Sequence, residues 1–279
     1  MESARVEPFR PGSLLWDGMG DRRLMLVLGG ALVMQVMHPQ IGAAIGQQSV
    51  YRTDPWGRLD RSLTSLLTWV YGGPDAVEEG HRLRALHKDI SGTDDQGRKY
   101  HALSAEPYAW VHLTAFERSV TVARYFGEEL TPEQERRTYE EIKQLGRILQ
   151  VPERMFPATV ADYWAYFDDM VANTLEDHPT AHDVLDAARR TVAPPYLPGA
   201  LRRLWGRHAL GANRVNLFLI VGTLPPAVRD KLGLAWTAAD ERRLRRLGRV
   251  VATVAPRLPE RLRYLPLAYQ ARVRSRSAP

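Results

Sequence analysis

The chain has no cysteine among its 279 residues. Disulfides, thiolate nucleophiles, iron–sulfur clusters and haem bound through a thiolate are therefore excluded. Residues 1–13 carry charges at Glu2, Arg5, Glu7 and Arg10 and have no apolar centre, unlike a secretory signal peptide. We therefore expect a cytoplasmic protein.

Long hydrophobic runs are also scarce. The most apolar stretch, residues 24–37, is interrupted by Gly29-Gly30 and Gln35 and ends at His38-Pro39. It covers about 14 residues, whereas a membrane-spanning helix needs roughly 20. We therefore expect a buried core helix and no transmembrane segment.

Lysine is also scarce. Nearly all of the positively charged residues are therefore arginines, and the net charge is +6. Most arginines of the last third alternate with Leu and Val at helical spacing, as in residues 242–247. A nucleic-acid site would gather such charge on one face with aromatic residues between. We interpret these arginines as solvated helix faces and expect no nucleic-acid partner.

Helical periodicity dominates the chain, and we find no alternating pattern typical of a strand. The sequence predicts an all-α protein with one helical domain, residues 21–279, after an N-terminal extension, residues 1–20. About ten to twelve helices are expected. The candidate helices are 22–37, 39–47, 55–71, 74–90, 104–126, 131–149, 159–176, 180–191, 198–209, 225–232, 237–254 and 258–272.

Capping residues support several of these boundaries. Asp54-Pro55 combines an N-cap with a proline at the first helical position. Thr131 followed by Gln134 has the spacing of a capping box. Gly92 is expected just past the C-terminus of the fourth helix. Residues 92–100 and the proline-rich 192–198 are predicted as loops.

Two histidine patterns could indicate a metal site. His178 and His182 are four residues apart and could share a helix face, but Pro179 places His178 at the helix start. Glu78 and His81 form one Glu-x-x-His motif, whereas a di-iron bundle needs two. Neither pattern is specific enough to predict a metal.

His87 stands out because of its helix face. It shares one apolar stripe with Ala76, Gly80, Leu83 and Ile90. A histidine on such a face is more often a hydrogen-bonded core residue than a ligand. A neutral imidazole against an apolar wall is nevertheless what an axial haem ligand requires.

Two other side chains have a structural and a functional interpretation. His38, before Pro39, lies where its helix must bend or end, so it either satisfies a neighbour or lines a pocket. Arg58 lies beside the apolar stripe of the predicted helix 55–71. It could bind an acidic group bidentately, or be a surface arginine with a buried stem.

Short motifs occur in a distinctive order between about residues 24 and 176. They are Gln35-Val36-Met37-His38-Pro39, Asp54-Pro55-Trp56-Gly57-Arg58-Leu59-Asp60-Arg61-Ser62, Tyr71-Gly72, Leu83-Arg84-Ala85-Leu86-His87, Tyr100-His101-Ala102 and Trp110-Val111-His112. Each motif is weak alone. Together they resemble the family of latex clearing proteins and MpaB-type oxygenases, and the last third of the chain carries no such motif.

This resemblance implies a globin-like all-helical core that holds haem b. It places the proximal iron ligand at His87, the pocket arginine at Arg58 and the pocket hydroxyl at Ser62, where the family usually has threonine. It also places Arg61 and Trp110 beside the cofactor.

Two positions depart from the rubber-cleaving members. Arg61 stands where those members can carry a lysine that caps the iron, and a guanidinium is a poor metal ligand. His38 stands where they carry a distal carboxylate. We therefore do not expect rubber cleavage, and we expect His38 to act on the distal side as an acid, a base or a hydrogen-bond donor.

The expected function is that of a haem-dependent oxygenase or oxidase. Its partners would be dioxygen and a small or lipid-like organic substrate. Two alternatives stay open: a non-catalytic protein that binds haem or an apolar ligand, and a haem-free helical protein that binds partners through its basic C-terminal helices. The sequence leaves the oligomeric state open.

Overall fold

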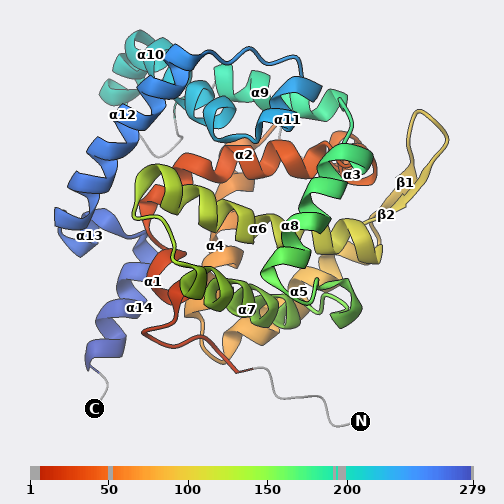
Figure 1. The fold of residues 1–279 in the computed structure, drawn as a ribbon, viewed down its shortest axis with the longest axis horizontal. Coiled ribbons are helices and arrows are strands. Elements are labelled where there is room, and N and C mark those ends of the chain that lie inside the picture. The colour runs from red at the N-terminus through yellow and green to blue at the C-terminus, as the bar shows by residue number, and fades with distance from the viewer. Residues whose placement is uncertain (1–6, 50–52, 191–192, 194–198, 278–279) are drawn as a thin grey trace.

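The computed structural model describes residues 7–49, 53–190, 193 and 199–277, with the backbone alone for 200–210. Its elements confirm the all-α prediction (Figure 1). The helices are α1 (Leu14–Gly18), α2 (Met25–Val36), α3 (Pro39–Gln48), α4 (Pro55–Tyr71), α5 (Asp75–His87), α6 (Ala105–Phe126), α7 (Pro132–Ile148), α8 (Val160–Asp169), α9 (Pro179–Arg189), α10 (Gly199–Thr223), α11 (Pro226–Lys231), α12 (Ala238–Val254), α13 (Glu260–Arg263) and α14 (Pro266–Ser277).

The predicted caps fix several helix starts. The Asp54 carboxylate accepts a hydrogen bond from the Gly57 N–H at 2.9 Å, and Pro55 opens α4. Thr131 and Gln134 form the predicted capping box of α7. These local bonds satisfy N–H groups that a helix leaves unpaired in its first turn.

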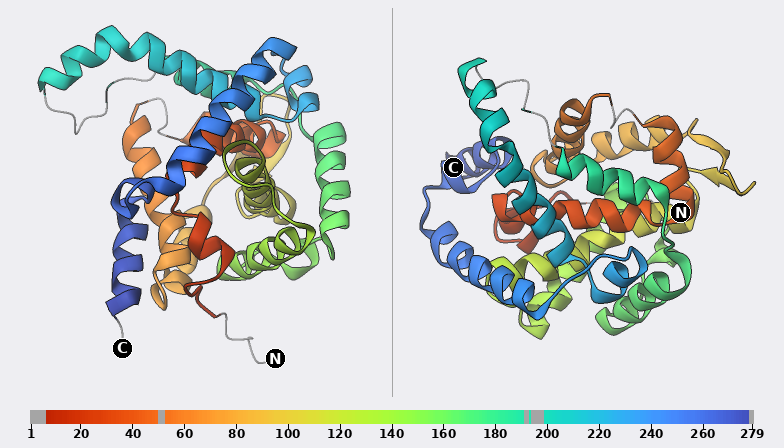
Figure 2. Two further views of the ribbon diagram at one scale, coloured as in Figure 1. Left: turned by 60° about the vertical axis from the view of Figure 1, so that its left-hand side comes forward. Right: turned by 90° about the horizontal axis from the view of Figure 1, so that it is seen from above.

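α2 lies across the middle of the molecule (Figure 1) and packs against α6, α9 and α10. The fully buried Val33 and Met34 place α2 inside the main hydrophobic core. A smaller cluster of Val27, Phe126 and Leu244 joins α2 to α6 and α12. α12 and α14 lie along one side of the bundle, as both views of Figure 2 show.

Part of the predicted N-terminal extension, from α1 onward, packs into the helical domain. Leu15 and Trp16 belong to the main core. The Glu141 carboxylate on α7 accepts hydrogen bonds from the N–H groups of Leu14 and Leu15, at 3.0 and 2.7 Å. A side chain from another helix therefore caps α1, which local sequence could not indicate.

A β-hairpin follows α5, where the sequence predicted no strand. β1 (Ser91–Thr93) pairs antiparallel with β2 (Lys99–His101). The prediction that Gly92 ends a helix is wrong, because α5 ends at His87 and Gly92 lies opposite Tyr100. A Cβ on Gly92 would lie 2.5 Å from the Tyr100 hydroxyl oxygen, which explains the glycine. Strands of three residues are too short to show alternation.

Two C-terminal helices also differ from their predicted ranges. α10 continues to Thr223, well past the predicted end at 209, and its last turns pack on α2. The predicted helix 258–272 is two helices, α13 and α14, because Pro266 begins a new one. The predicted loop 192–198 lies outside the described residues except for residue 193.

The arginines of α12 occupy its solvent face. Arg242, Arg243 and Arg246 are exposed, whereas Leu244 is fully buried. Arg243 pairs with Asp240 at 3.1 Å. The prediction of a solvated helix face is confirmed here.

In the described part of the chain, no single helix is both long enough and apolar enough to cross a membrane. One pair, Arg22–Val36 with Pro39–Gln48, meets those criteria of length and composition together, with a bend of 102° between its two halves.

Candidate functional site

The candidate site lies on the consecutive, packed helices α4 and α5, which carry His87, Arg58 and Ser62. The two helices touch where the Ser65 hydroxyl donates to the Glu79 carboxylate at 2.5 Å. Arg58 lies seven residues before Ser65 and Leu86 seven residues after Glu79, so each is about 10 Å along its own helix from that contact, on the side away from the connecting loop.

Burial decreases toward that end. Ser65 is 6% exposed, whereas Leu86, on the same face of α5 as Glu79, is 57% exposed. On α4, Leu67 is buried while Leu59 is only half-buried. Apolar side chains are thus left partly exposed at this end of α4 and α5. We call the four residues Arg58, Ser62, Leu86 and His87 the open end.

His87 is half-buried at the C-terminus of α5. Its Nδ1 lies 2.8 Å from the carbonyl oxygen of Leu83. A carbonyl only accepts, so Nδ1 carries the proton and Nε2 keeps its lone pair. The ring also meets the edge of Tyr108, with centroids 6.4 Å apart. The imidazole is held in the tautomer and orientation that suit a metal ligand.

Tyr108 is a residue that sequence reasoning missed. It lies on α6, and its hydroxyl donates to the Leu149 carbonyl at 2.9 Å, which fixes the ring against His87. Tyr108 contacts His87 only because the fold brings the start of α6 to the end of α5. No local sequence pattern indicates that contact.

Arg58 is half-buried without an acidic partner among the described residues. Burial lowers the pKa of its guanidinium, and the positive charge of Arg61 lowers it further. Arg61 itself is exposed and pairs with Asp54 at 3.2 Å. An arginine that stays partly desolvated without a carboxylate is suited to an anionic ligand.

Ser62 shares the face of α4 that carries Arg58 and Ser65, since it lies four residues after one and three before the other. Its side chain is exposed. Arg58 and Ser62 therefore share one face of α4, His87 lies at the C-terminus of α5, and Arg61 pairs with Asp54.

His38 lies elsewhere. It precedes α3, is 2% exposed, and neither ring nitrogen has a hydrogen-bond partner. Its Nε2 is 3.7 Å from the Glu106 carboxylate. Burial lowers the pKa of His38, and the neighbouring Glu106 opposes that shift. The Tyr166 hydroxyl is also buried and unpartnered, and burial raises its pKa, as does Glu106.

The two histidines contact opposite faces of α6. His38 approaches Glu106, whereas His87 packs on Tyr108. Side chains two residues apart leave a helix about 200° apart. The expected role of His38 on the distal side of His87 stays a prediction.

Trp110 also lies on the His38 side, four residues after Glu106. It is fully buried, and its indole N–H donates to the Met34 carbonyl at 3.2 Å. Its ring packs on Phe167, with centroids 5.6 Å apart. Trp110 is a core residue in this structure, and its expected place beside the cofactor stays a prediction.

The histidine patterns outside this site have structural partners. His178 caps α9, with Nδ1 accepting from the Thr180 N–H at 3.1 Å. His182 is exposed and pairs with Asp177 at 2.5 Å. Throughout the described part of the chain, no three or more His, Asp or Glu side chains gather as a metal site would need.

His112, from the Trp-Val-His motif, is a structural group. It is fully enclosed between α6 and α7, and Nε2–H donates to the Ile142 carbonyl at 2.7 Å. Burial lowers the pKa of His112 to about 4, from the ordinary value of 6.5. Protonation therefore favours the unfolded chain, and its effect grows as pH falls below 6.5.

Replacing His112 with glutamine should flatten the pH dependence of stability. Between pH 7 and pH 5 the histidine should cost the wild type about 2 kcal/mol of unfolding free energy, which H112Q would not lose. Urea denaturation of both proteins at both pH values measures the difference. Equal losses in the two proteins would show that His112 protonates normally in the folded state.

Comparisons with known proteins place this geometry in context. A family model described as "ER-bound oxygenase mpaB/B'/Rubber oxygenase, catalytic domain" matches residues 16–253. Two relatives are each 25% identical over 244 residues, covering 85% of this chain and 91% of the relative. They are "Uncharacterized protein Rv2237" of Mycobacterium tuberculosis and "Uncharacterized protein Mb2261" of Mycobacterium bovis. No solved structure gives a significant match.

Proposed function

Because this chain belongs to the family of mpaB-type and rubber oxygenase catalytic domains, we propose that it is a haem b-dependent oxygenase or oxidase that acts on a small or lipid-like organic substrate. One observation carries the haem part of this proposal. Among the described residues, the open end of α4 and α5 combines an imidazole bonded through Nδ1 to the Leu83 carbonyl with a half-buried arginine that has no acidic partner. An iron porphyrin with propionate groups needs both.

The donor chemistry at the open end fits the group. His87 would bind the iron through Nε2, while Nδ1–H stays on the Leu83 carbonyl and holds the ring. Arg58 would bind a propionate through paired N–H groups. Bound haem supplies the reaction with dioxygen, and this chain supplies orientation and shields the site from water.

Apolar side chains would cover the porphyrin. Leu86, which is 57% exposed, and the half-buried Leu59 and Leu63 offer the required surface at that end. The Ser62 hydroxyl, on the face of Arg58, can donate one hydrogen bond. His38, whose Nε2 lies 3.7 Å from the Glu106 carboxylate, would be the acid, base or hydrogen-bond donor of the distal side.

The test is the absorption spectrum of the full-length protein, purified from cells supplied with a haem precursor. We expect a Soret band and about one haem per chain, and oxygen uptake when a reductant and an organic substrate are added. Protein that stays colourless after reconstitution with hemin would contradict the haem proposal. A coloured protein that takes up no oxygen would contradict the oxygenase part.

Replacing Arg58 with glutamine should weaken haem retention. The variant loses a charge-assisted contact to a propionate, so we expect the haem dissociation rate to rise about tenfold. Transfer of haem to apomyoglobin measures this rate. R61Q is the matched control, since Arg61 is exposed and paired with Asp54. Equal rates in R58Q and wild type would remove Arg58 from the propionate site.

A further inference from the structure

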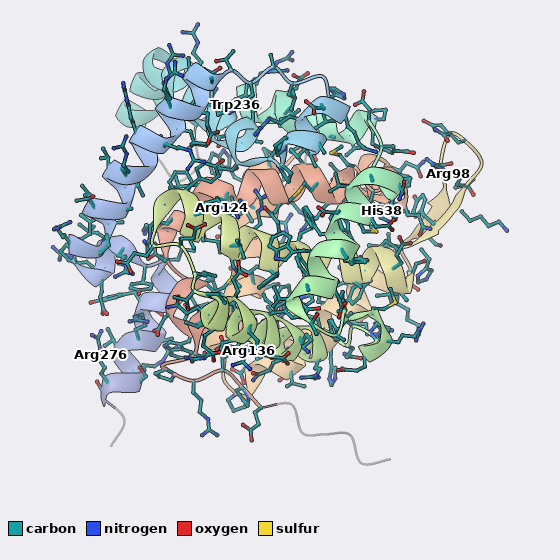
Figure 3. The ribbon with its side chains drawn as sticks, in the orientation of Figure 1. His38, Arg98, Arg124, Arg136, Trp236 and Arg276 are labelled. Atoms are coloured by element: carbon teal, nitrogen blue, oxygen red, sulfur yellow. The ribbon has the colours of Figure 1, made fainter. Side chains whose placement is uncertain are left out.

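A cavity of about 650 Å³ lies away from the open end. It is bounded by the C-terminal half of α6, by α8, by residues 223–226 and by the start of α12. Figure 3 labels two residues at its border, Arg124 on α6 and Trp236 just before α12. Its volume is in the range of small-molecule sites.

Aromatic side chains form the apolar part of this cavity. Trp164 and Phe167 come from α8, and Trp236 comes from the opposite wall. Phe167 is 4% exposed, while both tryptophans are half-buried. Aromatic rings that remain partly uncovered inside a concave site offer a surface for an apolar ring or chain.

The charges that line the cavity balance, with Arg124, Arg229 and Arg245 on one side and Glu117, Asp168 and Glu241 on the other. The buried Glu117 carboxylate is paired with Arg118. Glu241 is paired with Arg245 at 2.8 Å.

Three charged side chains of the lining stand outside these two pairs. Asp168 is exposed, and Arg124 is 3.8 Å from the exposed Glu129. The third is Arg229.

Arg229 is the side chain best placed to bind an anion. Its guanidinium lies over the Trp236 ring, 5.4 Å from the centroid. One nitrogen, Nη1, donates to the Leu224 carbonyl at 2.7 Å and holds the group in place. No carboxylate among the described residues pairs with it, and Nε and Nη2 make no hydrogen bond there. The cavity therefore contains a positioned and unused donor pair next to an aromatic wall.

We propose that this cavity binds a monoanionic amphiphile, a carboxylate carrying an aromatic ring or a short apolar chain. The carboxylate accepts hydrogen bonds from Nε and Nη2 of Arg229, and the apolar body packs between Trp236 and Trp164. The one guanidinium without a carboxylate partner and the exposed Asp168 favour a monoanion over a dianion. The site is independent of haem, since it shares no lining residue with the open end.

The test is calorimetric titration of the full-length protein with naphthalene-2-carboxylate and with its neutral analogue naphthalene-2-methanol. We expect the carboxylate to bind more tightly than the alcohol. R229Q should weaken carboxylate binding about tenfold and leave alcohol binding unchanged. A238W should remove both, because the exposed Ala238 lines the cavity and a tryptophan there would fill it.

Two controls keep the test decisive. Arg243 is exposed on α12 outside the cavity, so R243Q should bind like wild type. If circular dichroism shows that R229Q is unfolded, R124Q tests the charge instead. The proposal is overturned if wild type does not bind the carboxylate, if both probes bind equally, or if A238W binds as wild type does.

Discussion

Replacing His87 with alanine is expected to remove the Soret band. The variant loses the only iron ligand that the open end provides, so we expect its haem content to fall more than tenfold below that of wild type. The leucines and Arg58 would remain, but apolar contacts and one propionate contact do not fix an iron position. The measurement is the ratio of Soret to protein absorbance in full-length protein purified from haem-replete cells.

H81A is the matched control. His81 lies on the same helix, is exposed, and points away from the stripe of His87. Both variants should keep the helical circular dichroism of wild type, because the half-buried His87 ring fills no sealed core. Equal loss of haem in H81A would show that any change in α5 has this effect and that His87 is not the specific ligand.

Replacing Arg118 with methionine should destabilise the fold by about 3–5 kcal/mol. Arg118 is 2% exposed and Glu117 is 5% exposed. The guanidinium pairs with Glu117 and donates to the Thr223 carbonyl at 3.1 Å, so it links α6 to the end of α10. Its loss leaves a buried carboxylate with only the Thr121 hydroxyl as a partner, at 2.6 Å. Urea denaturation at pH 7 measures the change.

The double variant E117Q/R118M separates lost packing from an unpaired charge. Removing both charges avoids the buried carboxylate, so the double variant should be more stable than R118M alone. A loss below about 1 kcal/mol in R118M would mean that water reaches Glu117 in the folded protein, and the pair would then be a weak, solvated one.

Sequence reasoning predicted the fold best where the determinants are local. The capping side chains Asp54 and Thr131 act within three residues of themselves, and both helix starts were correct. The β-hairpin was missed because its strands are short and depend on distant partners. The Tyr100 hydroxyl, for example, donates to Gln47 at 2.7 Å. The end of α10 was missed because its last turns are defined by burial against α2.

The candidate site was predictable only in part, for the same reason. The apolar stripe on α5 predicts a buried His87, and the ring is half-buried against Tyr108. The α4 spacing places Arg58 and Ser62 on one face. Periodicity cannot say which face of α6 a residue contacts, and the structure has His38 at Glu106 and His87 at Tyr108. The cavity near Trp236 had no local signal, because its walls come from α6, α8 and the segment 223–245, which are separate in the sequence.

The measurement that tests the central claim most directly is chemical rescue of His87→Gly. If the His87 imidazole binds the iron, the glycine variant should lose haem, and added imidazole with hemin should restore the wild-type absorption spectrum. Free imidazole would then occupy the space that the side chain vacates. A glycine variant that holds haem with an unchanged spectrum in the absence of imidazole would contradict the account.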